Sequence, residues 1–255
     1  MRWFIDWLWK RKISRSSLVS LPRILDLPHN KKVLLISPHP DDEVFGCGGT
    51  LTLLKRNNCT IRIVVVTDGG KGDPLNKHGG MVCALRRQEV IAAMALLDIK
   101  DICFLMEPDG ELDVTLASVK KKLDDVYNDF KPDWVFTPSL YETHRDHVGV
   151  GYLTILHWIE RGFQERVFCY ELWGALPTNV LVDITAVIDT KKKLIGQYKI
   201  PLSYLEYFSP IMGLAAYRGL LLGDAKITRY AEAFLELPRS GEIYYLLASM
   251  LISRP

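Results

Sequence analysis

The chain has 255 residues, of which 48% are hydrophobic and 24% are charged, a balance typical of globular domains. Its 32 Lys and Arg residues nearly match its 30 Asp and Glu residues, for a formal net charge of +2, which excludes a strongly basic nucleic-acid-binding surface and a highly charged disordered chain. The five cysteines include no C-x-x-C pair, which excludes zinc ribbons and thioredoxin-like motifs and favours buried free thiols in a reducing cytoplasm.

Residues 1–30 are predicted to form an N-terminal arm or helix outside the main domain. Within residues 1–15, tryptophans at positions 3, 7 and 9 stand beside a cluster of Lys and Arg, a combination that suits a membrane interface. The alternative is an arm that packs on its own domain or on a neighbouring subunit. No apolar run reaches the roughly 20 residues that cross a bilayer. We therefore expect a cytoplasmic homo-oligomer whose membrane contact, if it has one, is peripheral and made by residues 1–15.

Strands and helices alternate regularly from residue 32 to residue 159. Continuous β-branched apolar runs predict buried parallel strands, and a 3.6-residue periodicity predicts the helices between them. The predicted strands are 32–37, 61–66, 102–105 and 134–136, and the predicted helices are 41–56, 83–97, 114–130 and 148–159. This order predicts an α/β fold with a three-layer, Rossmann-like (doubly wound), mostly parallel sheet that has helices on both faces.

Beyond Arg166 the pattern is looser. Residues 167–170 and 180–184 are predicted as additional edge strands, and residues 185–198 and 214–237 as helices. No linker rich in Gly, Ser or Pro interrupts the chain. We therefore expect one domain over residues 31–255, with a core at 31–200 and a C-terminal helical elaboration at 201–255.

Polar side chains gather where the predicted strands end. His39, Asp41 and Asp42 follow the first strand, Asp109 follows the third, and a His-Arg-Asp-His run at 144–147 follows the fourth. Ligands of open parallel sheets bind beyond the carboxyl ends of the strands. We therefore expect these side chains to meet in one crevice.

The residue types at that crevice suit a metal ion. His39 and Asp42 are three residues apart across a proline-stiffened turn, and two histidines at 144 and 147 have the same spacing at a predicted helix start. Imidazole and carboxylate ligands suit Zn²⁺ or another first-row divalent ion, and Asp41 then leaves a second carboxylate to take a proton from water. Taken alone, an acidic run is usually a helix cap and a His-x-x-His pair is usually incidental. At neighbouring strand ends the two motifs support each other.

Both motifs resemble those of the LmbE-like, or PIG-L-type, zinc-dependent N-deacetylases. The run Pro38-His39-Pro40-Asp41-Asp42-Glu43 is similar to one signature of that family, and His144-Arg145-Asp146-His147 is similar to its His-x-Asp-His motif. Weaker similarities extend the resemblance over residues 32–200 and are Thr67-Asp68-Gly69, Arg86-Arg87-Gln88-Glu89, Pro108-Asp109-Gly110, Pro132-Asp133 and Val182-Asp183-Ile184-Thr185.

The resemblance implies a role for each residue of the first motif. His39 and Asp42, together with His147, would hold the Zn²⁺ ion. Asp41 would be the general base that activates water and then the acid that protonates the leaving amine. The substrate implied is the acetamide of an N-acetylglucosamine-type sugar or its conjugate.

The resemblance also implies roles for four residues outside that motif. His144 would stabilise the oxyanion, and the Asp146 carboxylate would hydrogen-bond to its ring. An acid beside this ring would favour the imidazolium. Arg86 would contact the substrate, and Asp109 is a weaker candidate for binding a sugar hydroxyl.

Three other functions fit parts of the sequence. A metallo-phosphoesterase would need a second metal ion, for which Glu43 and Asp68 are the candidate ligands. A non-catalytic sugar- or lipid-binding module of the same fold would have no use for a base at Asp41. A dinucleotide-binding protein is suggested by glycines at 46, 48 and 49, but these do not form a G-x-G-x-x-G motif.

Two segments each have two interpretations, so the sequence does not identify the group attached to the sugar. The lysines of the glycine-rich loop at 69–80 either meet a phosphate or an acidic group of the substrate or are solvated. The residues after position 200 either line an acceptor site or pack in the core or against a subunit; they are Tyr204, Tyr207, Phe208, Met212, Tyr217 and Arg218.

Overall fold

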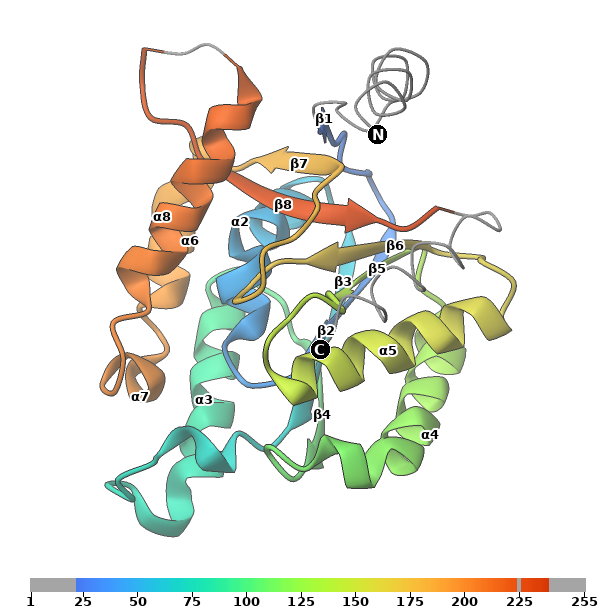
Figure 1. Ribbon diagram of the computed structural model, residues 1–255, viewed down its shortest axis with the longest axis vertical. Helices are drawn as coiled ribbons and strands as arrows, with labels where there is room; N and C mark the ends of the chain where they lie inside the picture. Colours follow the sequence, from blue (N-terminus) through green and yellow to red (C-terminus); the bar gives the residue numbers. More distant parts are fainter. Residues whose placement is uncertain (1–21, 224–225, 239–255) are drawn as a thin grey trace, which may run out of the picture.

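A central sheet organises the residues that the computed structural model describes, 22–223 and 226–238 (Figure 1). The sheet has eight strands in the order β1-β7-β8-β6-β5-β2-β3-β4. The strands are β1 Arg23–Ile24, β2 Lys32–Ser37, β3 Thr60–Thr67, β4 Asp101–Glu107, β5 Trp134–Pro138, β6 Arg166–Tyr170, β7 Val180–Asp183 and β8 Ala231–Glu236.

Seven α-helices and four short 3₁₀ turns connect these strands within the described residues. The helices are α2 Asp42–Arg56, α3 Val82–Ala95, α4 Leu112–Phe130, α5 Arg145–Glu160, α6 Ile188–Ile195, α7 Lys199–Leu202 and α8 Phe208–Gly219. The 3₁₀ turns are η3 Gly70–Gly72, η4 Gly79–Met81, η5 Thr185–Val187 and η6 Leu220–Leu222.

The strand β2 shows why the sheet is buried on both faces. Its side chains alternate between two hydrophobic cores: Val33 and Leu35 pack in one, and Leu34 and Ile36 in the other. The first core includes side chains of α2, α3, α6 and α8, and the second includes side chains of α4 and α5 (Figure 1). The three-layer, doubly wound, mostly parallel sheet predicted from the sequence is therefore confirmed.

The chain reverses direction across the sheet beside β2. From β2 it proceeds outward to β3 and β4, and it then returns to form β5 on the other side of β2. The helices that follow β2 and β3 cover one face, whereas those that follow β4 and β5 cover the other. This arrangement opens a crevice between the carboxyl ends of β2 and β5, where open α/β sheets bind their ligands.

The C-terminal part of the sheet differs from the prediction. The helix predicted over 214–237 is wrong beyond η6, because Ala231–Glu236 is the strand β8, antiparallel to both β6 and β7. Its sequence AEAFLE is rich in helix-forming Ala, Glu and Leu. Five of its six residues are buried between the neighbouring strands, so tertiary pairing overrides the local preference. Residues 201–255 are thus not a purely helical elaboration.

The predicted edge strands also have different places. β6 and β7 lie inside the sheet on either side of β8, and the edges are β1 and β4. β1 pairs in parallel with β7, and the adjacent Leu25 is buried, so the last residues of the predicted arm join the sheet. The predictions for the Trp-rich residues 1–15 lie outside the described residues. Homo-oligomer formation stays a prediction.

None of the helices in the described ranges combines the length and the apolar composition that crossing a bilayer requires.

Candidate active site

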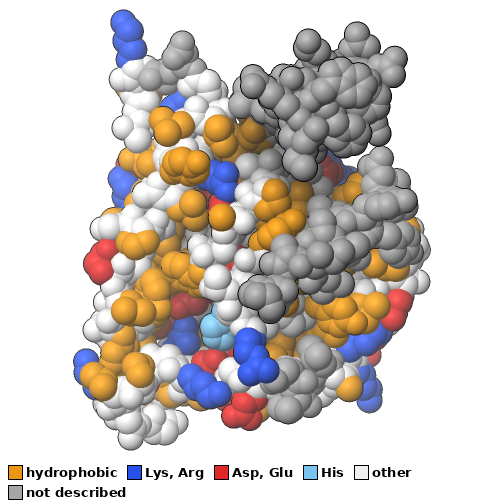
Figure 2. Space-filling view, viewed as in Figure 1, with side chains coloured by type: hydrophobic (Ala, Val, Ile, Leu, Met, Phe, Trp, Pro, Cys, Tyr) orange, Lys and Arg blue, Asp and Glu red, His pale blue; other side chains and the backbone are white. Residues whose placement is uncertain are grey.

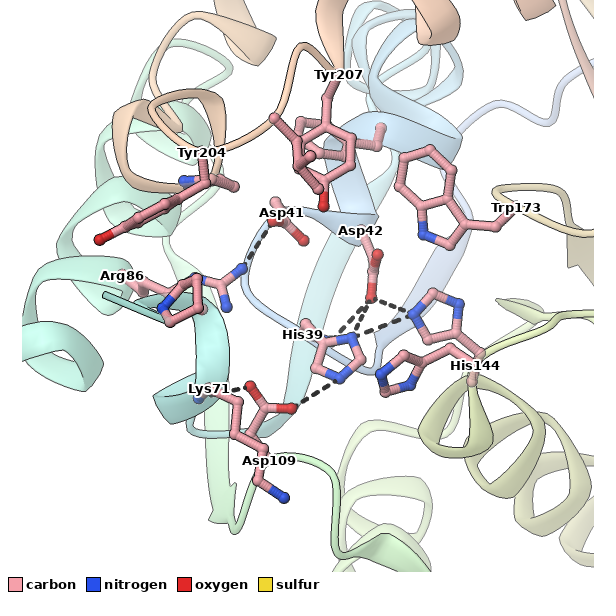
Figure 3. A pocket seen from close by; sticks show the side chains of 16 residues that line it. His39, Asp41, Asp42, Lys71, Arg86, Asp109, His144, Trp173, Tyr204 and Tyr207 are labelled. Atoms are coloured by element: carbon pink, nitrogen blue, oxygen red, sulfur yellow. Dashed lines mark hydrogen bonds and ion pairs between the residues drawn. The ribbon is translucent and has the colours of Figure 1, made fainter. Parts of the chain in front are cut away.

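The turn between β2 and α2 holds the first predicted motif in a strained backbone. Asp41 has φ 137° and ψ −30°, a conformation that non-glycine residues rarely adopt. The buried Glu43 carboxylate supports the turn, because its Oε2 accepts hydrogen bonds from the Asp41 N–H at 3.1 Å and from Ser37 Oγ at 3.0 Å. The Tyr198 hydroxyl donates to Oε1 of the same carboxylate. Asp41 and Asp42 consequently point to different parts of one pocket (Figure 3).

The three predicted metal ligands face one another in the crevice. His39 Nδ1 lies 3.1 Å from Asp42 Oδ2 and 3.1 Å from His147 Nε2, and His147 Nε2 lies 3.2 Å from Asp42 Oδ2. A tetrahedral metal centre with bonds of about 2.0 Å separates its ligand atoms by roughly 3.3 Å. All three side chains are buried, and their atoms have the spacing that one divalent cation needs.

The outer nitrogen of each ligand histidine faces a carboxylate. His39 Nε2 lies 3.2 Å from Asp146 Oδ2 and 3.3 Å from Asp109 Oδ1, and His147 Nδ1 lies 3.3 Å from Glu142 Oε2. Such carboxylates hold a proton on the outer nitrogen and leave the inner nitrogen with a lone pair. Two inner lone pairs only 3.1 Å apart repel unless a proton or a cation lies between them. The donor set therefore fits a bound divalent ion.

The charge balance of this cluster also favours a cation. Burial alone would lower the pKa of His147, but the Asp42 carboxylate outweighs burial and raises this pKa to about 9. Burial would also lower the pKa of His39, but hydrogen bonds to Asp109, Asp146 and Asp42 outweigh burial and raise this pKa well above its usual value. The pKa of Asp42 is lowered, against its burial, by His147 and His39. A buried site that stabilises positive charge in this way is suited to a metal ion.

Asp41 stands beside this cluster and is paired with Arg86. Arg86 Nη2 donates to Asp41 Oδ2 at 2.7 Å and to the Pro40 carbonyl at 2.7 Å, and Nη1 donates to the Gly69 carbonyl at 3.1 Å. Gly69 has φ +67°, and a Cβ there would lie 2.8 Å from Arg86 Nη1, so glycine leaves room for the guanidinium. Burial raises the pKa of Asp41 to about 8 despite the opposing charge of Arg86. A carboxyl of that pKa can take up and return a proton near neutral pH.

The two predicted substrate-binding residues both line the pocket, but their hydrogen bonds are with this chain. Arg86 is only 4% exposed and holds Asp41 in place. Asp109 turns Oδ1 toward His39 Nε2, and its Oδ2 accepts a hydrogen bond from the Lys71 N–H at 3.0 Å. Their contact with a substrate stays a prediction.

The predicted pairing of Asp146 with His144 is wrong in detail. The Asp146 carboxylate accepts a hydrogen bond from the Gly110 N–H at 2.7 Å and faces His39 Nε2. It is instead the backbone N–H of Asp146 that donates to His144 Nδ1, at 3.2 Å, because His144 is the N-cap of α5. Burial first, and then the nearby His39 and His147, lower the pKa of His144. The neutral ring, with its proton on Nε2, is therefore favoured over the predicted imidazolium.

Seven of the predicted site residues line a pocket of about 300 Å³ that opens to the surface: His39, Asp41, Asp42, Arg86, Asp109, His144 and His147. Figure 2 shows a histidine side chain exposed near the centre of this face, with basic and acidic side chains beside it. Opposite the metal-ligand cluster, the wall consists of side chains from the loop at 71–74 and from the C-terminal half of the chain: Lys71, Pro74, Trp173, Pro201, Tyr204, Leu205 and Tyr207. Figure 3 shows Trp173 and Tyr207 above the histidines, and Tyr204 and Lys71 farther from them.

Glu142 and Trp173 are site residues that were not predicted from the sequence, and Glu142 has the more extensive contacts. Besides His147 Nδ1, its carboxylate accepts hydrogen bonds from the N–H groups of Leu172 at 2.9 Å, Trp173 at 3.1 Å and Gly174 at 3.4 Å. Its position two residues before His144 was its only signal in the sequence. The contact with the loop after β6 joins residues about 30 apart and has no local pattern.

Known proteins are similar to this chain in both sequence and fold. A diacetylchitobiose deacetylase of Thermococcus kodakarensis is 30% identical over 228 residues, which are 82% of this chain and 84% of that protein. The family model described as PIG-L, GlcNAc-PI de-N-acetylase, matches residues 34–157. The chain belongs to the PIG-L family.

Two further relatives agree with this membership. A probable N-acetyl-alpha-D-glucosaminyl L-malate deacetylase 2 of Bacillus subtilis is 28% identical over 186 residues, which are 66% of this chain and 81% of that protein. The crystal structure of the N,N'-diacetylchitobiose deacetylase from Pyrococcus horikoshii superposes with a TM-score of 0.72 at 27% identity, over 94% of this chain and 93% of that one. The LmbE-like, or PIG-L-type, resemblance read from the two motifs is thereby confirmed.

The residues that line the pocket lie partly inside and partly outside the range that the PIG-L family model matches. All the predicted metal and catalytic residues lie within residues 34–157. The wall residues Trp173, Tyr204 and Tyr207 lie beyond that range. The predicted metal and catalytic residues therefore come from the matched part of the chain, and much of the opposite pocket wall comes from the part beyond it.

Replacing Glu142 with Gln is expected to weaken metal binding about 10–100-fold, the usual effect of losing the carboxylate that orients a ligand histidine. The reason is that a neutral amide oxygen accepts the hydrogen bond from His147 Nδ1 more weakly than a carboxylate does. The dissociation constant for Zn²⁺, measured by competition with a chromophoric chelator, checks this expectation. Glu160→Gln, the same change at an exposed position at the end of α5, the helix that carries His147, is the matched control. Equal affinities of the two variants would contradict the role given to Glu142.

Proposed function

We propose that this chain is a metal-dependent N-deacetylase that hydrolyses the acetamide of an N-acetylglucosamine-type sugar or its conjugate. The observation that carries the proposal is the mutual 3.1–3.2 Å spacing of three buried ligand atoms, with the Asp41 carboxylate beside them but outside the ligand set. The names of the relatives support the substrate class, because they include deacetylases of diacetylchitobiose and of an N-acetylglucosaminyl malate.

His39, Asp42 and His147 would hold the metal ion, and two imidazoles with one carboxylate suit Zn²⁺. When bound, such an ion polarises the acetamide carbonyl and lowers the pKa of a nearby water molecule. Asp109 and Asp146 orient His39, and Glu142 orients His147, so both rings are held ready for the ion.

Asp41 would act as the general base and then as the general acid. Its Oδ2 is bound by Arg86, so Oδ1 is the oxygen that would take a proton from the attacking water. The same carboxyl would then give the proton to the amine nitrogen as the C–N bond breaks, which turns a poor leaving group into a neutral amine. Its raised pKa, about 8, suits both steps.

His144 would stabilise the negative charge that develops on the acetamide oxygen. Its Nδ1 accepts a hydrogen bond from the Asp146 N–H, so Nε2 is the donor that remains for this oxygen. A donor held in place before the reaction stabilises such a charge without reorganisation. Asp146 would thus act on His144 through its backbone and on His39 through its side chain.

The competing functions find less support in the described residues. Glu43 and Asp68, the candidate ligands of a second metal, are engaged elsewhere: Glu43 supports the β2–α2 turn, and Asp68 Oδ1 accepts from the N–H groups of Gly70 and Asp109. A binding module would not need the strained backbone that presents Asp41. We therefore favour hydrolysis of an amide over phosphoester hydrolysis or simple binding.

Removal of the metal and its restoration test the proposed function. The full chain, stripped with a chelator, is expected to lose acetate release from N-acetylglucosamine, N,N'-diacetylchitobiose and N-acetylglucosaminyl malate, and one equivalent of Zn²⁺ is expected to restore it. A free-amine assay with acetate quantification measures both products. The proposal would be contradicted if the Zn²⁺-loaded chain released acetate from none of these sugars. Full activity of the metal-free chain would contradict it as well.

A further inference from the structure

Two aromatic side chains form a wall directly above the candidate metal ligands. Trp173 follows β6, and Tyr207 is the N-cap of α8, so distant parts of the chain supply them. Their ring centroids are 5.2 Å apart, and the Tyr207 ring also packs 5.8 Å from Phe45 on α2. All three line the pocket that contains His39, and Figure 3 shows the Tyr207 hydroxyl directed toward Asp41 and Asp42.

The polar groups of this wall are without partners in the described part of the chain. No described residue accepts a hydrogen bond from the Tyr207 hydroxyl or from the Trp173 indole N–H. Other tyrosines near the site are engaged: the hydroxyl of Tyr198 binds Glu43, and that of Tyr204 binds Asp73. Trp173 is 39% exposed and Tyr207 is half-buried, so both polar groups are accessible from the pocket and a ligand seated there can accept hydrogen bonds from them.

The wall is also held rigidly relative to the metal ligands. The backbone N–H of Trp173 donates to Glu142 Oε2 at 3.1 Å, and the same oxygen lies 3.3 Å from His147 Nδ1. On the other side, Phe45 belongs to the helix that begins at Asp42. A ligand seated on this wall would therefore have a defined distance to the reacting atoms, which is what a specificity subsite requires.

We propose that Trp173 and Tyr207 form the subsite for the pyranose ring of the substrate, an inference that rests on the proposed function. A pyranose presents a C–H face, which packs on aromatic rings, and a rim of hydroxyl groups, which accept hydrogen bonds. The aromatic pair offers two ring surfaces on which the C–H face can pack and two hydrogen-bond donors for the hydroxyl oxygens. The acetamide on the ring would then extend down to Asp41 and the metal ligands, while Lys71 and Tyr204 line the parts of the pocket left for the group attached to the sugar.

Tyr207→Phe and Trp173→Phe test this subsite, because each removes one donor and keeps an aromatic ring. We expect each variant to bind glucosamine about 5–15-fold more weakly than the wild type, the effect of losing one hydrogen bond to a ligand. Isothermal titration calorimetry on the full chain loaded with Zn²⁺ measures this dissociation constant. The kcat/KM for N,N'-diacetylchitobiose is expected to fall by a similar factor.

The matched control is Tyr217→Phe, a tyrosine of α8 that is 61% exposed and does not line the pocket. It is expected to match the wild type, and all variants are expected to keep one Zn²⁺ per chain. Glucosamine affinities of Tyr207→Phe and Trp173→Phe equal to that of Tyr217→Phe would overturn the subsite. This result is separate from a failure of the proposed function, which would appear as a wild type that releases no acetate, because the calorimetric measurement does not depend on turnover.

Discussion

Replacing Asp41 with Asn is expected to lower kcat for deacetylation by about 10³-fold or more while the chain keeps its metal ion. A general base and acid commonly contributes factors of 10²–10⁴, and here one carboxyl would serve in both steps. The amide oxygen of Asn can still accept the hydrogen bond from Arg86 Nη2, so the buried guanidinium keeps a partner. The variant should therefore fold and bind Zn²⁺ like the wild type.

Three measurements on this variant separate catalysis from structure. Acetate release gives kcat, elemental analysis gives the Zn²⁺ content per chain, and thermal denaturation reports folding. Asp189→Asn, at a carboxylate whose side chain is 82% exposed on α6, is the control and should be fully active. A kcat within tenfold of the wild type, with zinc present, would remove Asp41 from the role of general base.

Replacing His147 with Ala is expected to remove the metal ion and, with it, the activity. The change deletes one of three ligand atoms and leaves the buried Asp42 and Glu142 carboxylates without the ring that joins them. Because losing only a residue that orients a ligand weakens binding 10–100-fold, losing the ligand itself should weaken it by more than about 100-fold. The zinc content after gel filtration measures this loss.

A second variant distinguishes the loss of a metal ligand from unfolding of the chain. His147→Gln keeps a polar side chain in the buried position and should also lose zinc, whereas His29→Ala, at an exposed histidine before β2, should keep it. Circular dichroism would establish that each variant is folded. A full zinc complement in both folded His147 variants would falsify the ligand set and, with it, the proposed mechanism.

Much of the fold, and the proximity of His39, Asp42 and His147, could be predicted because the signals are local. The run Val33-Leu34-Leu35-Ile36 is apolar on both faces, and β2 is buried on both faces. As predicted, His39 and Asp42 lie in and next to one turn at the start of α2, and His144 and His147 lie at the start of α5. The rule that ligands bind at the carboxyl ends of parallel strands was then enough to bring residues 42 and 147 together.

The hydrogen bonds around the cluster could not be predicted in the same way. The family resemblance implied a hydrogen bond from the Asp146 carboxylate to the ring of His144, but the start of α5 turns this carboxylate toward His39 and leaves the backbone N–H on His144. The hydrogen bond from Arg86 to Asp41, which are 45 residues apart, was likewise not foreseen, and the predicted contact of Arg86 with a substrate stays a prediction. In both cases the partner is decided by which elements pack together, and nothing in the local sequence reports it.

The amino-acid sequence by itself determined the alternation of strands and helices in the first half of the chain and the two motifs that identify the family, because each depends on periodicity or spacing within a few residues. Only the tertiary structure decided that Ala231–Glu236 forms a strand, that Glu142 joins His147 to the loop of Trp173, and that Tyr207 reaches the pocket. These features are contacts between segments distant along the chain. Burial and pairing in the assembled sheet outweigh local preference there, so they exist only once the whole domain has folded.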